Sequence, residues 1–295
     1  MMTSNFQQLV SMKGMLALAM ERKFAIPHIN VNNLEWIQAA LSAAMQARSP
    51  IIIGVSEGAA RYMGGYKIVY YMVTETMKTM KCDVPVALHL DHGSYKACLE
   101  ALDAGFSSIM FDGSSLPFAE NLEQTQALIQ LCQQANVSLE VEVGAIGGEE
   151  DGISSEGECA DVQECAAISK LNIDILAAGI GNIHGLYPDD WKGLHFDLLE
   201  EIANITGKPL VLHGGSGIPD EQVQKAIALG VRKVNVNTEC QIAFTGAVYE
   251  YVAEHENFLI GKAYDPRKYI KIGKQAIIDT CIEKMKLFNS FGQIK

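Results

Sequence analysis

The chain has 295 residues, of which 48% are hydrophobic and 20% charged, and its formal net charge is −12. This length allows a large buried core, and α/β barrels of about 250 residues form one domain, so we predict one domain over residues 1–295. The negative charge argues against a nucleic-acid partner, which needs basic patches. No basic segment with an apolar run opens the chain, and the apolar stretches are too short to cross a membrane. We therefore expect a cytoplasmic protein with no membrane partner.

Seven cysteines are scattered along the chain, and none forms a CxxC pair. Their odd number and their spacing favour reduced thiols in a cytosolic protein over a disulfide framework or a cysteine metal site. Cysteine chemistry is therefore not expected to carry the function.

Eight apolar, β-rich segments recur along the chain, and helix-length amphipathic segments separate them. The predicted strands are 25–30, 50–55, 84–90, 108–112, 138–143, 173–178, 210–213 and 233–236. The predicted helices are 34–47, 67–80, 95–104, 118–134, 162–169, 196–206, 221–229 and 238–254. This alternation indicates a parallel sheet covered by helices, and eight units favour a closed (β/α)8 TIM barrel. The alternative, an open doubly wound sheet, usually has fewer units and a glycine fingerprint after strand one; this chain reads HINVNNLE there.

Three further segments lie outside this pattern. Residues 11–23 predict an added N-terminal helix, and residues 267–288 predict a long C-terminal helix. The glycine-rich segment 144–157 is too long for an ordinary βα loop, and long loops at the top of a barrel are usually functional lids.

Three histidines stand at the ends of predicted strands, each followed by glycine: His92, His184 and His213. Catalytic groups of a barrel lie at the carboxyl ends of its strands, so these imidazoles face one mouth, with Asp91 beside them. Three imidazoles with an open fourth position are typical of catalytic zinc. The alternative is that they are hydrogen-bonded structural histidines. We interpret the remaining four as structural: His28, His89, His195 and His255.

A glycine-rich turn follows the seventh predicted strand and reads HGGSG from His213 to Gly217. Such a turn directs backbone N–H groups at a ligand, and the loops after strands seven and eight are the usual phosphate site of this fold. Asn237 and Thr238 open the next helix, whose N-terminus favours an anion. The pattern therefore predicts a phosphate site, the alternative being a plain glycine turn.

A Schiff-base aldolase needs a lysine at the inner end of a strand. The lysines near the predicted strands, Lys208 and Lys233, come before or at the start of a strand, where we expect them on the wrong face. This position favours a metal ion as the electrophile.

Six motifs, in order and spread over about residues 9–290, resemble the class II fructose-bisphosphate and tagatose-bisphosphate aldolases. They are LHLDHG (88–93), VEVGAIGGEEDG (141–152), GNIHGLY (181–187), LHGGSGIP (212–219), KVNVNTE (233–239) and YDPRKY (264–269). The resemblance implies zinc-dependent, reversible cleavage of a phosphorylated ketose to dihydroxyacetone phosphate and glyceraldehyde 3-phosphate, a step of glycolysis or related carbohydrate metabolism. It also implies a monovalent cation (Na+ or K+) near the phosphate and a homodimer or homotetramer.

The resemblance also implies a role for each matching residue. Asp91 matches the acid/base for the C4 hydroxyl, and Glu150 matches the group that shuttles the C3 proton. The metal ligands would be His92, His184 and His213, with Glu142 near an alternative metal position. The substrate-binding residues would be Asn30, Ser56, Asp112, Gly185, Gly214, Gly215, Ser216, Asn235, Asn237, Thr238 and Arg267, the last reaching in from a neighbouring subunit in some relatives.

Several segments depart from the pattern of these aldolases. Pro188 stands where many relatives carry lysine, which Lys192 could replace; the fructose-type GQFN is here PHIN (27–30), and DGSSLPF (112–118) is nearer the tagatose type. The sugar therefore stays open between fructose and tagatose bisphosphate. Two further alternatives are an aldolase for another phosphorylated ketose or keto acid, such as 6-phospho-5-dehydro-2-deoxygluconate, and a non-catalytic barrel subunit.

Overall fold

Eight parallel strands close into a barrel, as the sequence predicts. The computed structural model describes residues 8–150, 153–255, 257 and 259–295. The strands are β1 (Ile26–Asn30), β2 (Ile51–Ser56), β3 (Val86–Gly93), β4 (Ser108–Phe111), β5 (Ser138–Val143), β8 (Ile175–Ala178), β10 (Leu210–Leu212) and β11 (Val231–Val236). They follow one another around the barrel in chain order, and β11 closes it by pairing with β1. The (β/α)8 prediction is confirmed.

The predicted helices surround the barrel. They are α2 (Leu34–Ala47), α4 (Tyr66–Met80), α5 (Tyr95–Ala104), α6 (Phe118–Ala135), α7 (Val162–Ser169), α8 (Phe196–Thr206), α9 (Asp220–Ala228) and α10 (Thr238–Glu254). One short helix, α3 (Glu57–Met63), is an addition that the sequence analysis missed. The Ser56 hydroxyl caps it by accepting a hydrogen bond from the backbone N–H of Ala59 at 3.2 Å.

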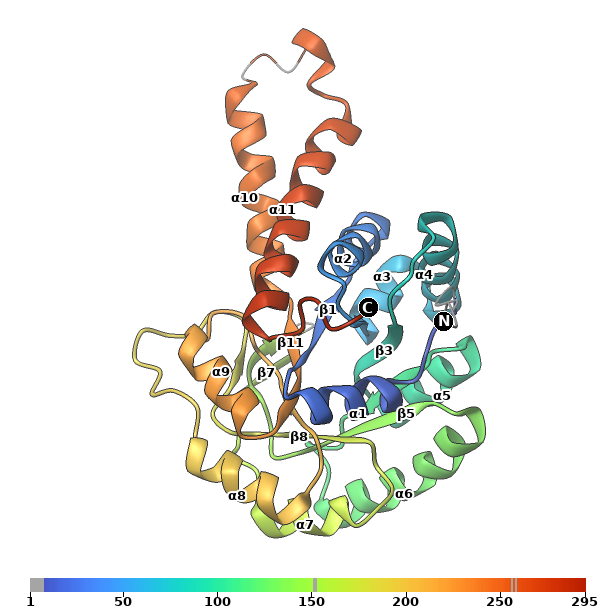
Figure 1. The fold of residues 1–295 in the computed structure, drawn as a ribbon, viewed down its shortest axis with the longest axis vertical. Coiled ribbons are helices and arrows are strands. Elements are labelled where there is room, and N and C mark those ends of the chain that lie inside the picture. Colours follow the sequence, from blue (N-terminus) through green and yellow to red (C-terminus); the bar gives the residue numbers. More distant parts are fainter. Residues whose placement is uncertain (1–7, 151–152, 256, 258) are drawn as a thin grey trace.

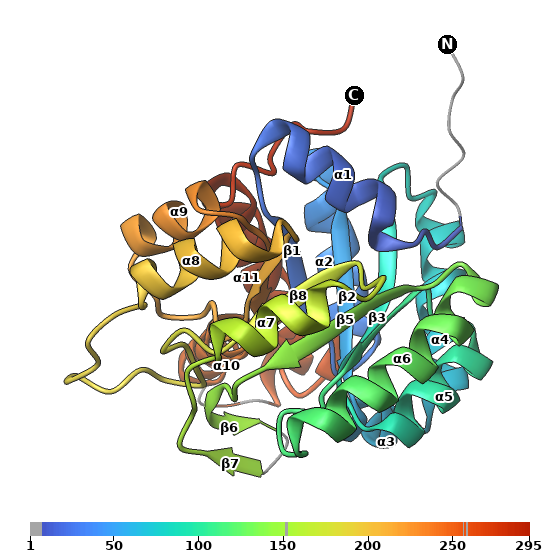
Figure 2. The same ribbon diagram turned by 90° about the horizontal axis from the view of Figure 1, so that it is seen from below.

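The N-terminal helix α1 (Met12–Arg22) closes one end of the barrel interior. Its buried residues Met12, Met15 and Leu16 pack against inward-facing strand residues such as Ile26 and Ile52. Figure 2 shows α1 and the C-terminal end of the chain at one end of the molecule, and the hairpin of β6 and β7 at the other. The barrel is therefore plugged at the end opposite to the predicted active site.

The glycine-rich segment after β5 forms a small sheet that the sequence did not predict. Strand β6 (Gly147–Glu150) pairs antiparallel with β7 (Ile153–Ser155) and parallel with β9 (Ile183–His184). Gly148 has φ +89°, and a Cβ there would lie 2.1 Å from the carbonyl oxygen of His184, so this contact needs glycine. The predicted lid is thus joined by hydrogen bonds to the segment that carries one of the three histidines.

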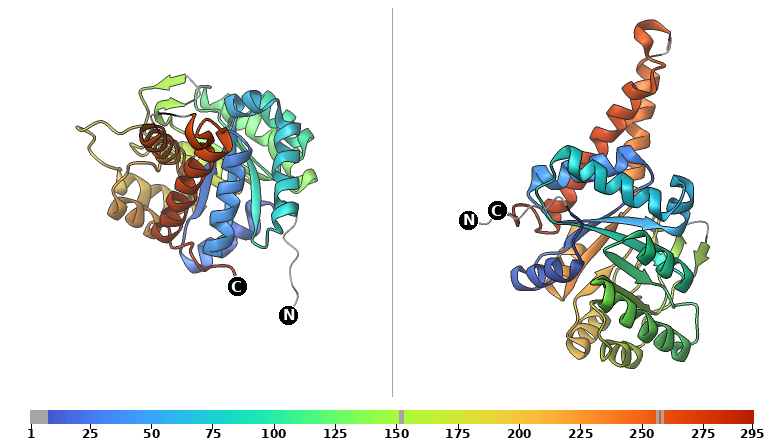
Figure 3. Two further views of the ribbon diagram at one scale, coloured as in Figure 1. Left: turned by 90° about the horizontal axis from the view of Figure 1, so that it is seen from above. Right: turned by 90° about the vertical axis from the view of Figure 1, so that its right-hand side faces the viewer.

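Helices α10 and α11 (Pro266–Leu287) pack side by side and leave the barrel as a long arm. The arm projects well beyond the other helices in Figures 1 and 3. Among the residues that the structure describes, no helix is long and apolar enough to span a membrane.

Candidate active site

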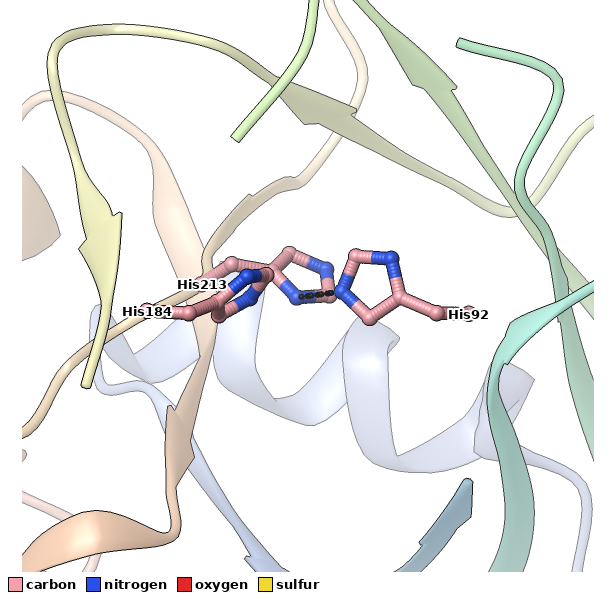
Figure 4. A group of neighbouring side chains, drawn as sticks. All are labelled: His92, His184 and His213. Atoms are coloured by element: carbon pink, nitrogen blue, oxygen red, sulfur yellow. Dashed lines mark hydrogen bonds between the residues drawn. The ribbon is translucent and has the colours of Figure 1, made fainter. Parts of the chain in front are cut away.

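The three predicted histidine ligands meet at the mouth of the barrel. His92 lies at the end of β3, His184 in β9 and His213 directly after β10. Their candidate ligand atoms lie within 4.8 Å of one another, and the rings are mutually edge-on (Figure 4). His92 Nε2 and His213 Nδ1 face each other at 3.0 Å. The sequence thus identified residues that are far apart in the chain and adjacent in space.

Carboxylates behind two of the rings fix which nitrogen faces the site. His92 Nδ1 donates to Asp112 Oδ2 at 2.8 Å, and His213 Nε2 donates to Glu140 Oε1 at 2.9 Å. Each ring then directs the lone pair of its other nitrogen into the gap between them. Lone pairs 3.0 Å apart repel unless a cation lies between them, so the site fits a metal ion, and an imidazole donor set suits zinc.

Burial and neighbouring charge adjust these groups for binding a cation. Burial, His92 and Lys233 lower the pKa of His213 well below its ordinary value, so its ring is neutral, the form that binds a metal. Burial opposes ionisation of Asp112, but the His92 ring and hydrogen bonds from Ser114 outweigh it and lower the pKa of Asp112. Asp112 therefore supports His92 as a charged acceptor.

Glu142 lies on β5 beside this group, and its Oε2 is 3.9 Å from His92 Nδ1. Burial and the nearby Asp112 raise the pKa of Glu142 well above its ordinary value. Its Oε2 is buried without a hydrogen-bond partner among the described residues. With His92 and Asp112 it forms a second group of metal-binding geometry, which is consistent with the predicted alternative metal position.

The prediction that Lys233 lies on the wrong face of its strand is wrong. Lys233 is fully buried inside the barrel, where its Nζ lies 2.8 and 3.0 Å from the two Glu140 oxygens. Position 233 pairs with Ile26 of β1, which also points inward, and β11 begins two residues before it, at Val231, earlier than its apolar pattern suggested. Lys233 neutralises the carboxylate that holds His213, and it does not line the main cavity.

Asp91 stands next to His92 at the end of β3 with both carboxylate oxygens held. Oδ2 accepts from Asn30 Nδ2 at 2.9 Å, and Oδ1 accepts from Asn235 Nδ2 at 3.2 Å. Asp91 is buried, yet it forms part of the wall of a cavity of about 700 Å³. An oriented carboxylate at the cavity wall suits a proton acceptor.

Most of the predicted substrate-binding residues line that cavity. They are Asn30, Ser56, Gly185, Gly214, Ser216, Asn235, Asn237 and Thr238. The Ser216 hydroxyl accepts from the backbone N–H groups of Asn237 and Glu239 at 3.4 and 3.2 Å, so the turn after β10 is fixed to the start of α10. Backbone amides at this helix start and positive-φ glycines form the kind of concave surface that binds phosphate.

Three of the predicted substrate-binding residues do not line that cavity: Asp112, Gly215 and Arg267. Asp112 supports His92, as described above, and Gly215 packs its backbone on β11, donating to the Asn235 carbonyl at 2.9 Å. Arg267 is exposed near the start of α11, paired with Asp265 at 2.6 Å and outside the cavity wall of its own chain. Glu150 lies in β6, but its side chain falls outside the described part of the chain.

Some functional positions were missed by the sequence analysis. Glu140 was counted only as part of a strand, although its alternation with Glu142 along β5 places both inward. Asn182 donates to the His213 carbonyl at 3.1 Å, and the Tyr187 hydroxyl donates to the Gly214 carbonyl at 2.8 Å. Glu149, adjacent to the predicted Glu150, lines the cavity.

The fold and the site define a barrel of the enzyme type, with a candidate metal site beside a candidate phosphate-binding turn. Comparison with known proteins is more specific: residues 10–293 match the family model "Fructose-bisphosphate aldolase class-II". The chain belongs to this family, and it is an aldolase, a lyase that acts on carbon–carbon bonds.

Named relatives cover nearly the full chain. It is 57% identical to a fructose-bisphosphate aldolase of Mycoplasma pneumoniae (96% of this chain, 98% of the relative). It is 48% identical to one of Streptococcus pyogenes serotype M1, with the same coverage. The crystal structure of a putative fructose-1,6-bisphosphate aldolase from Coccidioides immitis superposes with a TM-score of 0.83 at 29% identity, covering 95% of this chain and 96% of that one. These likenesses confirm the resemblance drawn from the motifs.

Proposed function

We propose that the protein cleaves fructose 1,6-bisphosphate reversibly to dihydroxyacetone phosphate and glyceraldehyde 3-phosphate, with zinc held by His92, His184 and His213. The observation that carries this proposal is the convergence of three imidazoles next to Asp91, on a cavity whose other side is a phosphate-binding turn. Fructose 1,6-bisphosphate is favoured because the named relatives at 48–57% identity carry that name.

The residues of the chain then divide the work. Zinc, when bound, supplies a Lewis acid that polarises the ketone carbonyl and stabilises the charge left by carbon–carbon cleavage. Asp91, oriented by Asn30 and Asn235, takes the proton of the C4 hydroxyl as the bond breaks. Glu150 returns a proton to C3. The turn after β10 and the start of α10 bind the phosphate of the ketone half, which positions the reacting carbons.

Two further parts of the proposal concern partners. A monovalent cation (Na+ or K+) binds near this phosphate. The α10–α11 arm mediates a homodimer or homotetramer. It exposes the large hydrophobic side chains Tyr249, Val252, Leu259, Ile260 and Tyr264. In this assembly, Arg267 reaches the far phosphate of the substrate bound to a neighbouring subunit. We also propose that the protein is cytoplasmic.

A substrate panel tests the sugar. Purified protein is assayed with fructose 1,6-bisphosphate, tagatose 1,6-bisphosphate and 6-phospho-5-dehydro-2-deoxygluconate, and kcat/KM is compared. We expect the highest value for fructose 1,6-bisphosphate, with glyceraldehyde 3-phosphate as product. Release of malonic semialdehyde from the third compound as the main activity would contradict the proposal.

Metal removal tests the chemistry. Activity should vanish in excess chelator and return with zinc or cobalt, whereas full activity in chelator would exclude the metal mechanism. Because Lys233 lies inside the barrel, borohydride trapping with substrate is a direct check on the other aldolase chemistry. We expect no adduct, since Lys233 is held by Glu140 away from the cavity wall.

A further inference from the structure

His28 is a buried histidine that the proposed reaction does not use. It lies in the middle of β1, points into the barrel and is fully buried. In the register of the sheet it sits beside Asn235 of β11 and Ile52 of β2. The sequence predicts a structural role for it, at a position where the fructose-type motif has glutamine.

The barrel makes room for this ring at one specific place. A Cβ built at Gly54, on the adjacent strand β2, would lie 1.5 Å from His28 Nε2 and 2.3 Å from its Cδ2. The imidazole therefore occupies the volume that a side chain at position 54 would take. Glycine at 54 and histidine at 28 are matched by shape.

The ring reaches the back of the proposed proton acceptor. His28 Nε2 lies 3.9 Å from Asp91 Oδ2, and the ring meets His89 edge-on at a centroid distance of 5.3 Å. Both ring nitrogens, and the Oδ1 of the adjacent Asn235, are buried without a hydrogen-bond partner among the described residues. His28 Nε2 faces Asp91, and the ring interacts with the side chain of Asn235, so His28 lies against the pair that the proposed reaction relies on.

A neutral imidazole is well suited to this place. Burial and Lys233 lower the pKa of His28 to about 4, so the ring is uncharged near pH 7 and carries one donor and one acceptor. Asn235 donates through Nδ2 to Asp91 Oδ1, which requires its amide to keep one orientation. The His28 ring interacts with the side chain of Asn235, and its N–H near Asn235 Oδ1 favours that orientation, whereas an apolar neighbour would offer this oxygen no donor at all.

We propose that His28, accommodated by Gly54, is a positioning residue that holds Asp91 and Asn235 in the orientation needed to take the C4 hydroxyl proton. This inference rests on the proposed function, because it assigns His28 an effect on one proton transfer only. Cleavage requires Asp91, whereas exchange of the C3 hydrogen of dihydroxyacetone phosphate with solvent requires the metal and the other proton carrier. If His28 positions Asp91, replacing it should lower the rate of cleavage and leave the rate of C3 hydrogen exchange unchanged.

The experiment compares His28→Phe, which keeps a ring of similar size, with His28→Gln, which keeps a donor and an acceptor. For each variant, kcat and KM for cleavage, the rate of C3 hydrogen–deuterium exchange and the zinc content are measured. We expect His28→Phe to lose 10–100-fold in kcat, the usual cost of removing a support behind a functional group, with KM, exchange and zinc content nearly unchanged. His28→Gln should recover most of the loss.

Other outcomes separate the possibilities. Equal losses of cleavage and exchange in His28→Phe would show a general structural role and overturn the inference, as would full cleavage activity. If the unaltered protein neither cleaves fructose 1,6-bisphosphate nor exchanges the C3 hydrogen, the proposed function fails, independently of any His28 variant.

Gly54→Ala provides a second test from the opposite side of the contact. Its added Cβ displaces the His28 ring, so it should lower kcat to a similar extent as His28→Phe. In a His28→Ala background the space is open, and Gly54→Ala should then add no further loss; additive losses would contradict the match between the two positions. Gly14→Ala on α1 is the matched control, because a Cβ there meets nothing within 4 Å.

Discussion

The two ends of the barrel interior are built from the same strands and carry opposite kinds of side chain. At the end that α1 closes, inward positions are apolar, as at Ile52 and Ala87. Four residues further along the same strands, the inward positions are Ser56 and Asp91, which line the cavity. Because side chains alternate along a strand, each step of two residues moves one layer up the barrel. One end therefore provides burial and the other provides chemistry.

The layer between the ends shows how charge is accommodated there. Glu140, Lys233, His89 and His28 are all fully buried. Glu140 contacts Lys233, His213 and, at 3.5 Å, His89, while His89 Nδ1 hydrogen-bonds Ser108 Oγ at 2.6 Å. Buried charges are tolerated when paired in this way. We therefore expect the apolar end to tolerate substitutions that change the chemical type of a side chain slightly, but not those that change its volume. We expect the polar end to tolerate small changes in side-chain volume, but not the loss of a polar group.

The largest expected effect is at the polar end, from Asp91→Ala. Removing a positioned proton acceptor costs about 10²–10⁴-fold in rate, so kcat for cleavage should fall by that factor. Zinc content should stay the same, since Asp91 is oriented by Asn30 and Asn235 and is not one of the three clustered imidazoles. Steady-state kinetics with metal analysis measures both. Loss of zinc together with activity would instead make Asp91 part of the metal site.

The matching change at the apolar end is Leu16→Ala on α1. Leu16 is buried against the strand ends, and truncating a buried leucine lowers the free energy of unfolding by about 2–5 kcal/mol. Denaturant unfolding measures the loss, while kcat/KM of the folded protein should stay near that of the original chain. Met20→Ala, on the exposed side of the same helix, is the control and should change stability little. A large loss of activity from Leu16→Ala in folded protein would show that the two ends are coupled.

The sequence predicts the polar end better than the layer below it. His92, His184 and His213 were identified because glycines follow them at strand ends, where a barrel places its chemistry. Glu140 and Lys233 were missed or misplaced because their role depends on partners 93 residues apart across the barrel, which no local pattern encodes. The apolar pattern also placed the start of β11 two residues late, at Lys233 itself, so Lys233 was not identified as an inward-facing residue within the strand.

Irregular segments were predicted least well. The lid of residues 144–157 was predicted from its length and glycine content, but its pairing with β9 depends on a backbone approach at Gly148 that only three dimensions show. Arg267 was identified from its motif alone. In the folded chain it lies outside the cavity wall, because α11 begins toward the outer end of the projecting arm, away from the barrel.

Acid should weaken the fold through the buried histidines of the middle layer. The pKa of His28 is lowered to about 4, so below pH 6.5 the unfolded chain binds a proton that the folded chain does not. Stability therefore falls as pH drops from about 6.5 to about 4, by about 3 kcal/mol for this one group. Unfolding of metal-free protein at several pH values measures the slope. His28→Gln should flatten it, and an unchanged slope would mean that His28 titrates normally.

The smallest expected effect comes from replacing the buried ion pair itself, with Glu140→Leu and Lys233→Met together. Exchanging a buried pair for apolar residues of similar size is often neutral for stability, so the barrel should fold. His213 Nε2 then loses the acceptor that fixes its ring, and the loss of such a support costs about 10–100-fold in metal affinity. Competition with a zinc chelator measures the affinity. The exposed pair of Arg48 and Asp83, replaced in the same way, is the control and should leave it unchanged. Equal zinc affinity in both double variants would mean that the middle layer serves only to neutralise charge, and that the polar end orients its own ligands.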